Sequence, residues 1–142
     1  LTPSFPAVPG QPVVVTVLAD AFSAIASRTL SFDGVPVALD ERGRAVITPS
    51  APGLYALVAT ATDLDGFVGR FERTLKVRDP ADTAAPVVAL DALLAGARFA
   101  APGAIVGSVS DVNLESWSLA IARFGTEAFV EVASGTGAFA RG

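Results

Sequence analysis

Short runs of apolar and β-branched residues, broken by turn signals, dominate the first half of the chain, and no stretch repeats with the period of a helix. Between two of these runs lies Asp33-Gly34, which favours a tight hairpin because a type I′ turn needs positive φ at both central residues. Runs spaced this closely are typical of a β-sandwich. The runs that we expect to form strands are residues 11–20, 28–32, 35–39, 44–48, 54–62 and 67–77.

A segment without large apolar residues interrupts this pattern at residues 79–86, where prolines and aspartates favour a linker. We therefore expect one domain at residues 1–78 and a second at residues 87–142. The runs that we expect to form strands in the second domain are residues 87–90, 104–109, 116–122 and 128–133.

The two halves repeat one arrangement, in which an apolar strand ends in aspartate and a loop with one apolar residue leads to a second strand. The first copy contains Asp20, and the second contains Asp111. Aligning the copies places Val14, Thr16 and Leu18 on the face that corresponds to Val109. The residues between them are also apolar valines, so the register shifted by one residue stays open.

Residues 53–63 read Gly-Leu-Tyr-Ala-Leu-Val-Ala-Thr-Ala-Thr-Asp and are followed by Asp65-Gly66. This run resembles the penultimate strand of bacterial immunoglobulin-like (Big-type) domains, whose pattern is Gly-x-Tyr-x-apolar-x-apolar-x-Ala-x-Asp and then a turn with Gly. The resemblance implies a tyrosine-corner role for Tyr55, with its ring in the core and its hydroxyl bonded back to the backbone. Alternation of side chains along a strand places Tyr55, Leu57, Ala59 and Ala61 on one face.

The resemblance extends over nearly the whole chain. Residues 82–88 look like the opening of the next module in arrays of such domains. Residues 107–114, with a turn at 134–137, look like immunoglobulin-like segments of very large bacterial secreted proteins, some of which carry RHS/YD repeats. The implied fold class is all-β, with tandem immunoglobulin-like β-sandwiches, and the implied location is extracellular or at the bacterial cell surface.

The second domain looks incomplete, with strands A to about C′/D, because no second Gly-x-Tyr strand precedes Gly142. Half a sandwich exposes an apolar sheet face and unpaired strand edges. We expect either that more of the same chain follows in a longer protein or that another chain supplies the strands. The chain starts at Leu1 and contains no methionine, which likewise indicates an excerpt or a processed product.

The amino-acid composition excludes several kinds of catalytic and binding site. The chain has no histidine and no cysteine, which excludes Ser-His-Asp and Cys-His triads, the usual zinc sites and disulfides. The net charge is −4 and Lys76 is the single lysine, so we expect no nucleic-acid partner. The most apolar long window, residues 87–107, contains Asp91 and Arg98, and we expect no membrane insertion.

Acidic residues in the loops are candidate calcium ligands, because calcium prefers carboxylate and carbonyl oxygens. The candidates are Asp20, Asp63, Asp65, Asp79, Asp82, Asp111 and Asn113. An immunoglobulin-like topology places the first three at one pole of the first domain. The last four would meet at the junction of the two domains, where calcium would stiffen the array as it does in cadherin-like modules. The alternative is ordinary turn and linker chemistry with no cofactor.

The sequence gives less support to a catalytic or sugar-binding role than to ordinary turn and core positions for the same residues. Asp40 and Glu41 are adjacent, so a strand would send them to opposite faces, and a solvated turn is favoured. Trp117, Phe124 and Phe129 would suit a sugar-binding platform, but Trp117 occupies the place where immunoglobulin-like folds bury a core tryptophan. We therefore do not expect an enzyme.

The sequence as a whole predicts a non-catalytic structural or interaction module, a spacer or stalk, of a large bacterial extracellular or surface protein. Its partners would be neighbouring domains of the same large chain, together with another protein chain or a glycan. One alternative is a ligand-binding adhesin module, either calcium-stiffened or carbohydrate-binding. Another is an accessory domain of a secreted enzyme or toxin.

Overall fold

The computed structural model describes residues 7–91 and 104–140, with only the backbone at 139–140. The fold is all-β, with antiparallel sheets of the β-sandwich kind, and the described residues contain no helix. The chain divides into two compact units, Leu1–Pro80 and Ala81–Gly142. Each unit is described by itself below.

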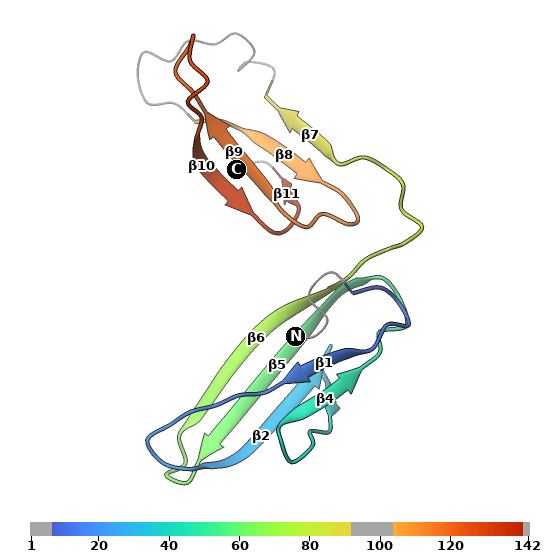
Figure 1. Ribbon diagram of the computed structural model, residues 1–142, viewed down its shortest axis with the longest axis vertical. Coiled ribbons are helices and arrows are strands. Elements are labelled where there is room, and N and C mark those ends of the chain that lie inside the picture. The colour runs from blue at the N-terminus through green and yellow to red at the C-terminus, as the bar shows by residue number, and fades with distance from the viewer. Residues whose placement is uncertain (1–6, 92–103, 141–142) are drawn as a thin grey trace. The chain divides into compact units, whose positions relative to one another are not determined.

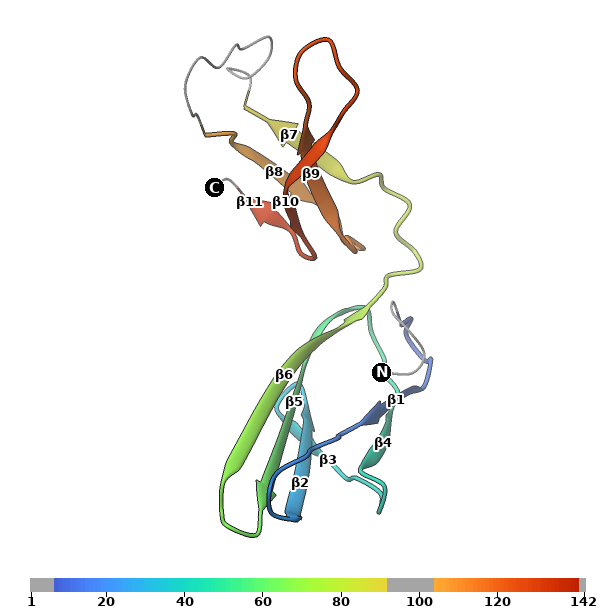
Figure 2. The same ribbon diagram turned by 60° about the vertical axis from the view of Figure 1, so that its left-hand side comes forward.

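The first unit consists of two antiparallel sheets in separate layers, as Figure 2 shows. One sheet pairs β1 with β4, and the other has the strand order β3-β2-β5-β6. The strands are β1 (Val13–Thr16), β2 (Ile25–Phe32), β3 (Val35–Val37), β4 (Arg44–Ile47), β5 (Gly53–Asp63) and β6 (Val68–Val77). The predicted hairpin at Asp33-Gly34 is confirmed, because it joins β2 to β3 with φ of 50° and 80° at its two residues.

Both sheets supply the core of the first unit, which makes it a closed sandwich. Val13, Val15, Ala45 and Ile47 enter the core from the small sheet, and Leu30, Leu57, Leu75 and Val77 enter it from the large sheet. Burying one large aliphatic side chain contributes about 1.5–3 kcal/mol, so this layer of contacts is the main stabilising term of the unit.

The register expected for β1 is wrong by one residue. Val17 is 5% exposed whereas Leu18 is 85% exposed, and Val13 and Val15 are buried with Val17. Val109 is buried in the second unit, so its counterparts in the first are the odd-numbered valines and not Val14, Thr16 and Leu18. Valines fill both faces of this segment, so alternation could not fix the register, and packing against the large sheet decided it.

Ala7, at the start of the described chain, lies beside Val77 at the end of β6. Ala7 pairs with Val77 as an isolated parallel bridge, and the amide of Arg78 donates to the carbonyl oxygen of Ala7 at 2.6 Å. Both bridge residues are buried in the core. The segment before β1 is thereby held against the end of β6.

Within residues 81–91 and 104–140, the second unit has five strands in two sheets, labelled in Figure 1. They are β7 (Val87–Leu90), β8 (Gly107–Ser110), β9 (Trp117–Ile121), β10 (Val130–Gly135) and β11 (Phe139–Ala140). One sheet has the order β11-β8-β7, and the other pairs β9 with β10. The strands overlap the predicted runs, except that β11 was not expected after the turn at 134–137.

Trp117 and Gly135 fix the pairing of β9 with β10. They are directly opposite in the register, and a Cβ added at Gly135 would lie 2.9 Å from atoms of the indole ring. The indole N–H donates to the carbonyl oxygen of Gly137 at 3.0 Å. The half-buried tryptophan therefore lies over a position where only glycine leaves room for it.

Two leucines on neighbouring strands test how much the closed core contributes. Leu75 is 1% exposed and Leu54 is 68% exposed. We expect Leu75→Ala to lower the free energy of unfolding of the first unit by about 2–5 kcal/mol, because it leaves a cavity in the core. Leu54→Ala is the matched control and should change it by about 0.5 kcal/mol or less. Denaturant unfolding followed by Tyr55 fluorescence measures both, and equal effects would contradict the assignment of the core.

Candidate functional site

Asp63 ends β5 and organises the turn that leads into β6. Its Oδ1 accepts hydrogen bonds from the amides of Asp65 at 3.1 Å and Phe67 at 2.9 Å. Gly66 adopts φ of 85° in this turn, a conformation that favours glycine. The side chain of Asp63 is buried, so its carboxylate is used to satisfy backbone donors.

The loop between β1 and β2 is tied to the turn between β5 and β6. The amide of Leu64 donates to the carbonyl oxygen of Ala24 at 2.9 Å, and the hydroxyl of Ser23 donates to Oδ2 of Asp65. Figures 1 and 2 both show these two connections side by side at the same end of the unit. The fold thus brings Asp63 and Asp65 into one turn, with Asp20 on the neighbouring loop.

Three of the four residues predicted at the junction are linked within the second unit. Asp82 accepts from the amide of Ala84 through Oδ1 and from Nδ2 of Asn113 through Oδ2, both at 2.9 Å. Asp111 Oδ1 accepts from the backbone amide of Asn113 at 2.7 Å. Asp79 belongs to the first unit. The side-chain amide of Asn113 thus lies beside the Asp82 carboxylate. There it supplies the partial positive charge that a bound cation would supply.

The two sets of candidate calcium ligands can be compared with what a metal ion needs in the part of the chain that the structure describes. Within residues 7–91 and 104–140, which include every candidate ligand, no three acidic side chains converge closely enough to hold a metal ion. The carboxylates described above instead accept hydrogen bonds from amide and hydroxyl groups. These hydrogen bonds are of the turn and linker kind, which is the alternative to calcium binding, and a comparison in calcium and in chelator tests between the two.

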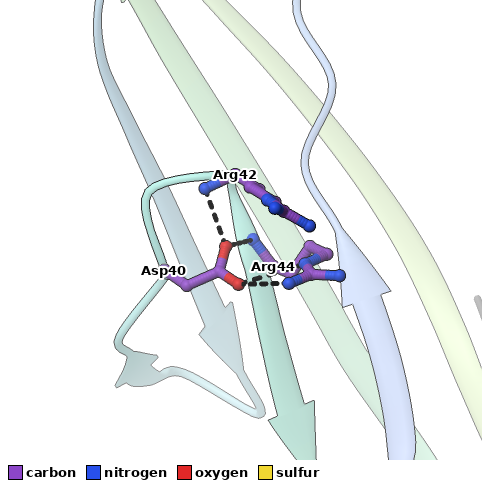
Figure 3. Close-up of polar contacts among 3 residues, drawn as sticks. All are labelled: Asp40, Arg42 and Arg44. Atoms are coloured by element: carbon purple, nitrogen blue, oxygen red, sulfur yellow. Dashed lines mark hydrogen bonds and ion pairs between the residues drawn. The ribbon is translucent and has the colours of Figure 1, made fainter.

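Asp40 anchors the turn that precedes β4, as Figure 3 shows. Its Oδ1 accepts from the amides of Arg42 at 2.9 Å and Arg44 at 2.8 Å, while Oδ2 accepts from the Arg44 guanidinium at 3.0 Å. The Arg44 amide, more than the guanidinium, lowers the pKa of the Asp40 carboxyl. Asp40 and Glu41 lie in an exposed turn, as their adjacency in the sequence indicated, and the Asp40 carboxylate accepts hydrogen bonds from backbone amides of that turn.

The two tied loops also expose large apolar side chains that the sequence analysis did not single out. We call Phe22, Leu64 and Phe67 the apolar loop tip. Phe22 is fully exposed, and the other two are largely exposed. Their exposure could have been predicted from their position next to turn residues, because an apolar side chain in a turn has no strand face to bury it.

The aromatic residues of the second unit do not share one environment. Trp117 is half-buried, whereas Phe124 is fully exposed and Phe129 is largely exposed. Because the indole N–H is bonded to Gly137, the described contacts favour the packing role that the sequence analysis preferred for Trp117.

Comparisons with known proteins give no relative: no family model matches the chain, and no curated protein or solved structure matches it significantly. In the described residues, no helix is long and apolar enough to cross a membrane. The part of the apolar window 87–107 that holds Arg98 lies outside the described residues.

We expect the unfolding midpoint of the chain to be the same in millimolar calcium and in chelator, because carboxylates of both acidic groups already accept hydrogen bonds. The chain has one tyrosine and one tryptophan, so Tyr55 and Trp117 fluorescence report on the two units separately. A ligand that binds only the folded state raises the midpoint with its concentration. A saturable rise that Asp65→Asn or Asp111→Asn abolishes would contradict the expectation and reveal a calcium site.

Proposed function

We propose that this chain is a non-catalytic structural module, a spacer or stalk built from immunoglobulin-like (Big-type) domains of a large bacterial extracellular or surface protein. Its partners would be the neighbouring domains of that protein. The proposal rests on the resemblance carried by residues 53–63. It is supported by the hydroxyl of Tyr55, which donates to the carbonyl oxygen of Ala51 at 3.0 Å, as the tyrosine-corner expectation requires.

The single observation that most favours a mechanical role is the parallel pairing of Ala7 with Val77. Tension between the two ends of the unit would load this parallel bridge along the direction of the chain, so that its contacts would be sheared together. The amide of Arg78 and the buried side chains of Ala7 and Val77 add to this junction. A spacer that transmits tension needs such an arrangement where the chain enters and leaves a domain.

The segment between the units supports the same role. At its start, Arg78 is bonded to Ala7 of the first unit, and further along Asp82 is bonded to Asn113 of the second unit. The connection is therefore attached to each unit by a hydrogen bond within a few residues. A connection bonded near both of its ends is what we expect of a spacer.

Pulling single molecules of the full chain tests the mechanical role. The chain has no cysteine, so introduced cysteines give unique attachment points. We expect the first unit to unfold at a clearly higher force when pulled between its N-terminus and Pro80→Cys than between Pro52→Cys and Arg78→Cys. The first geometry shears the Ala7–Val77 pair. The second separates β5 from β6 one bond at a time, because Gly53 and Val77 are paired at the end of the hairpin.

Equal unfolding forces in the two geometries would contradict a force-resisting role. Forced unfolding depends on the unfolding rate, so equilibrium stability measured on the same cysteine variants provides the control. Variants of equal stability and unequal force support the proposal.

A ligand-binding adhesin is the second candidate, and the apolar loop tip favours it. Exposed aromatic side chains on loops held by a rigid scaffold are typical of recognition surfaces. A glycan screen with the full chain tests it. We expect any ligand held by this tip to be lost in Phe22→Ser and Phe67→Ser but kept in Phe124→Ser, the control on the second unit. Equal loss in all three variants, or retention in all three, would exclude the tip as the binding surface.

A further inference from the structure

Strand β6 lies at one edge of the large sheet of the first unit, as the strand order β3-β2-β5-β6 and Figure 1 show. Its inner edge pairs with β5 over its whole length. Because Val77 pairs with β5 on that side, its parallel bridge to Ala7 lies on the outer edge. In the part of the chain that the structure describes, no strand pairs with this outer edge along residues 68–74. We call residues 68–74 the outer segment of β6.

The backbone groups of the even-numbered residues point toward this outer edge. On the outer side, the amide of Arg78 donates to the carbonyl oxygen of Ala7. On the side of β5, the carbonyl oxygen of Phe67 accepts from the amide of Asp63. Successive residues of a strand direct their backbone groups to opposite edges, and the pairing of β5 with β6 contains no bulge. The even-numbered residues of the outer segment therefore offer N–H and C=O groups to an added strand.

The side chains of the outer segment are exposed on both faces of the strand. All seven residues of this segment are exposed, whereas Leu75 directly after it is buried. Phe71 lies on the same face of the strand as Leu75 and is nevertheless 65% exposed. On the other face, the Arg70 guanidinium and the Glu72 carboxylate form an ion pair at 2.8 Å. An exposed aromatic residue thus stands between an arginine and a glutamate.

This order of residues is complementary to itself when two copies of β6 pair antiparallel. With Phe71 opposite Phe71 of the second copy, Arg70 of each copy lies opposite Glu72 of the other. Opposite charges directly across two strands stabilise the pairing. The backbone groups of Phe71 point toward β5, so the two phenylalanines form a pair without mutual backbone hydrogen bonds, in which opposite side chains come closest.

The same charges disfavour the neighbouring registers. A slip of the second copy by two residues is the smallest one that keeps the same backbone groups paired. It places Arg70 opposite Arg70 or Glu72 opposite Glu72, and like charges directly opposite are destabilising. Charged residues on an edge strand ordinarily prevent strand addition. In the outer segment they instead select one register of a pair of identical strands.

We propose that the chain forms a two-fold symmetric dimer in which the outer segments of β6 from two copies pair antiparallel about Phe71. The occupant of this edge is a second copy of the chain, because the order of its charges fits itself. A two-fold axis makes the same surface serve both copies. The large sheets of two first units would thereby join into one continuous sheet. The inference goes beyond the spacer role and does not depend on it.

Sedimentation equilibrium of the full chain at rising concentration measures the association, and we expect a monomer–dimer equilibrium. Amide hydrogen exchange locates the contact. We expect the amides of Arg70, Glu72 and Thr74 to exchange more slowly in the dimer than in the monomer. The amides of Gly69 and Phe71 point toward β5, so their exchange should not change.

Two charge-reversal variants test the register. Arg70→Glu places glutamate opposite glutamate, and Glu72→Arg places arginine opposite arginine. We therefore expect each variant alone to have a dissociation constant at least ~10-fold higher than that of the unaltered chain. An equimolar mixture of the two variants restores both pairs of opposite charges. We expect this mixture to form a heterodimer whose dissociation constant is within about threefold of the original.

Arg42→Glu and Glu41→Arg are the matched controls, because they make the same charge changes in the exposed turn before β4. They should leave the association unchanged. Tyr55 fluorescence during denaturant unfolding verifies that each variant keeps the folded first unit.

A chain that stays monomeric up to ~1 mM would overturn the proposal. So would a dimer whose affinity the mixture of charge-reversal variants does not restore, because the contact would then lie elsewhere. Slow exchange of the even-numbered amides of the outer segment at every concentration would show that another part of the same chain covers this edge, and would likewise exclude the dimer.

Discussion

A sheet with one apolar face must have that face covered by another layer, and both units depend on this constraint. In the first unit, β5 meets it most directly. It joins β2 to β6 in the large sheet, and its Leu57 lies in the core with Val13 of β1 and Ile47 of β4. In the described part of the second unit, Val109 is buried, whereas Val88, Ile121 and Val130 are exposed.

Several aspartate carboxylates of this chain stabilise turns by accepting hydrogen bonds from nearby backbone amides. Asp40, Asp63, Asp82 and Asp111 each accept at least one backbone amide hydrogen bond within a few residues of their own position. Such bonds satisfy donors that a tight turn leaves without a strand partner. Three of the residues that the sequence offered as calcium ligands, Asp63, Asp82 and Asp111, therefore have a structural use in their own turns.

Local chemistry made several features predictable. Asp33-Gly34 specified a hairpin because few other residue pairs adopt positive φ twice in succession. The hydrogen bond of Tyr55 followed from the resemblance of its strand. The register of β1 was not predictable, because valines occupy both of its faces and only the opposing sheet distinguishes them. The apolar loop tip was missed because periodicity says nothing about side chains in loops, where Phe22 and Leu64 lie, and because Phe67 was expected to open the strand that in fact begins at Val68.

The sequence by itself determined the all-β class and the sites of most turns, because turn residues and alternation act over a few neighbours. The tertiary structure decided which valines of β1 are buried, which loops are tied together, and which strand edges are paired. These features depend on contacts between segments far apart in the chain.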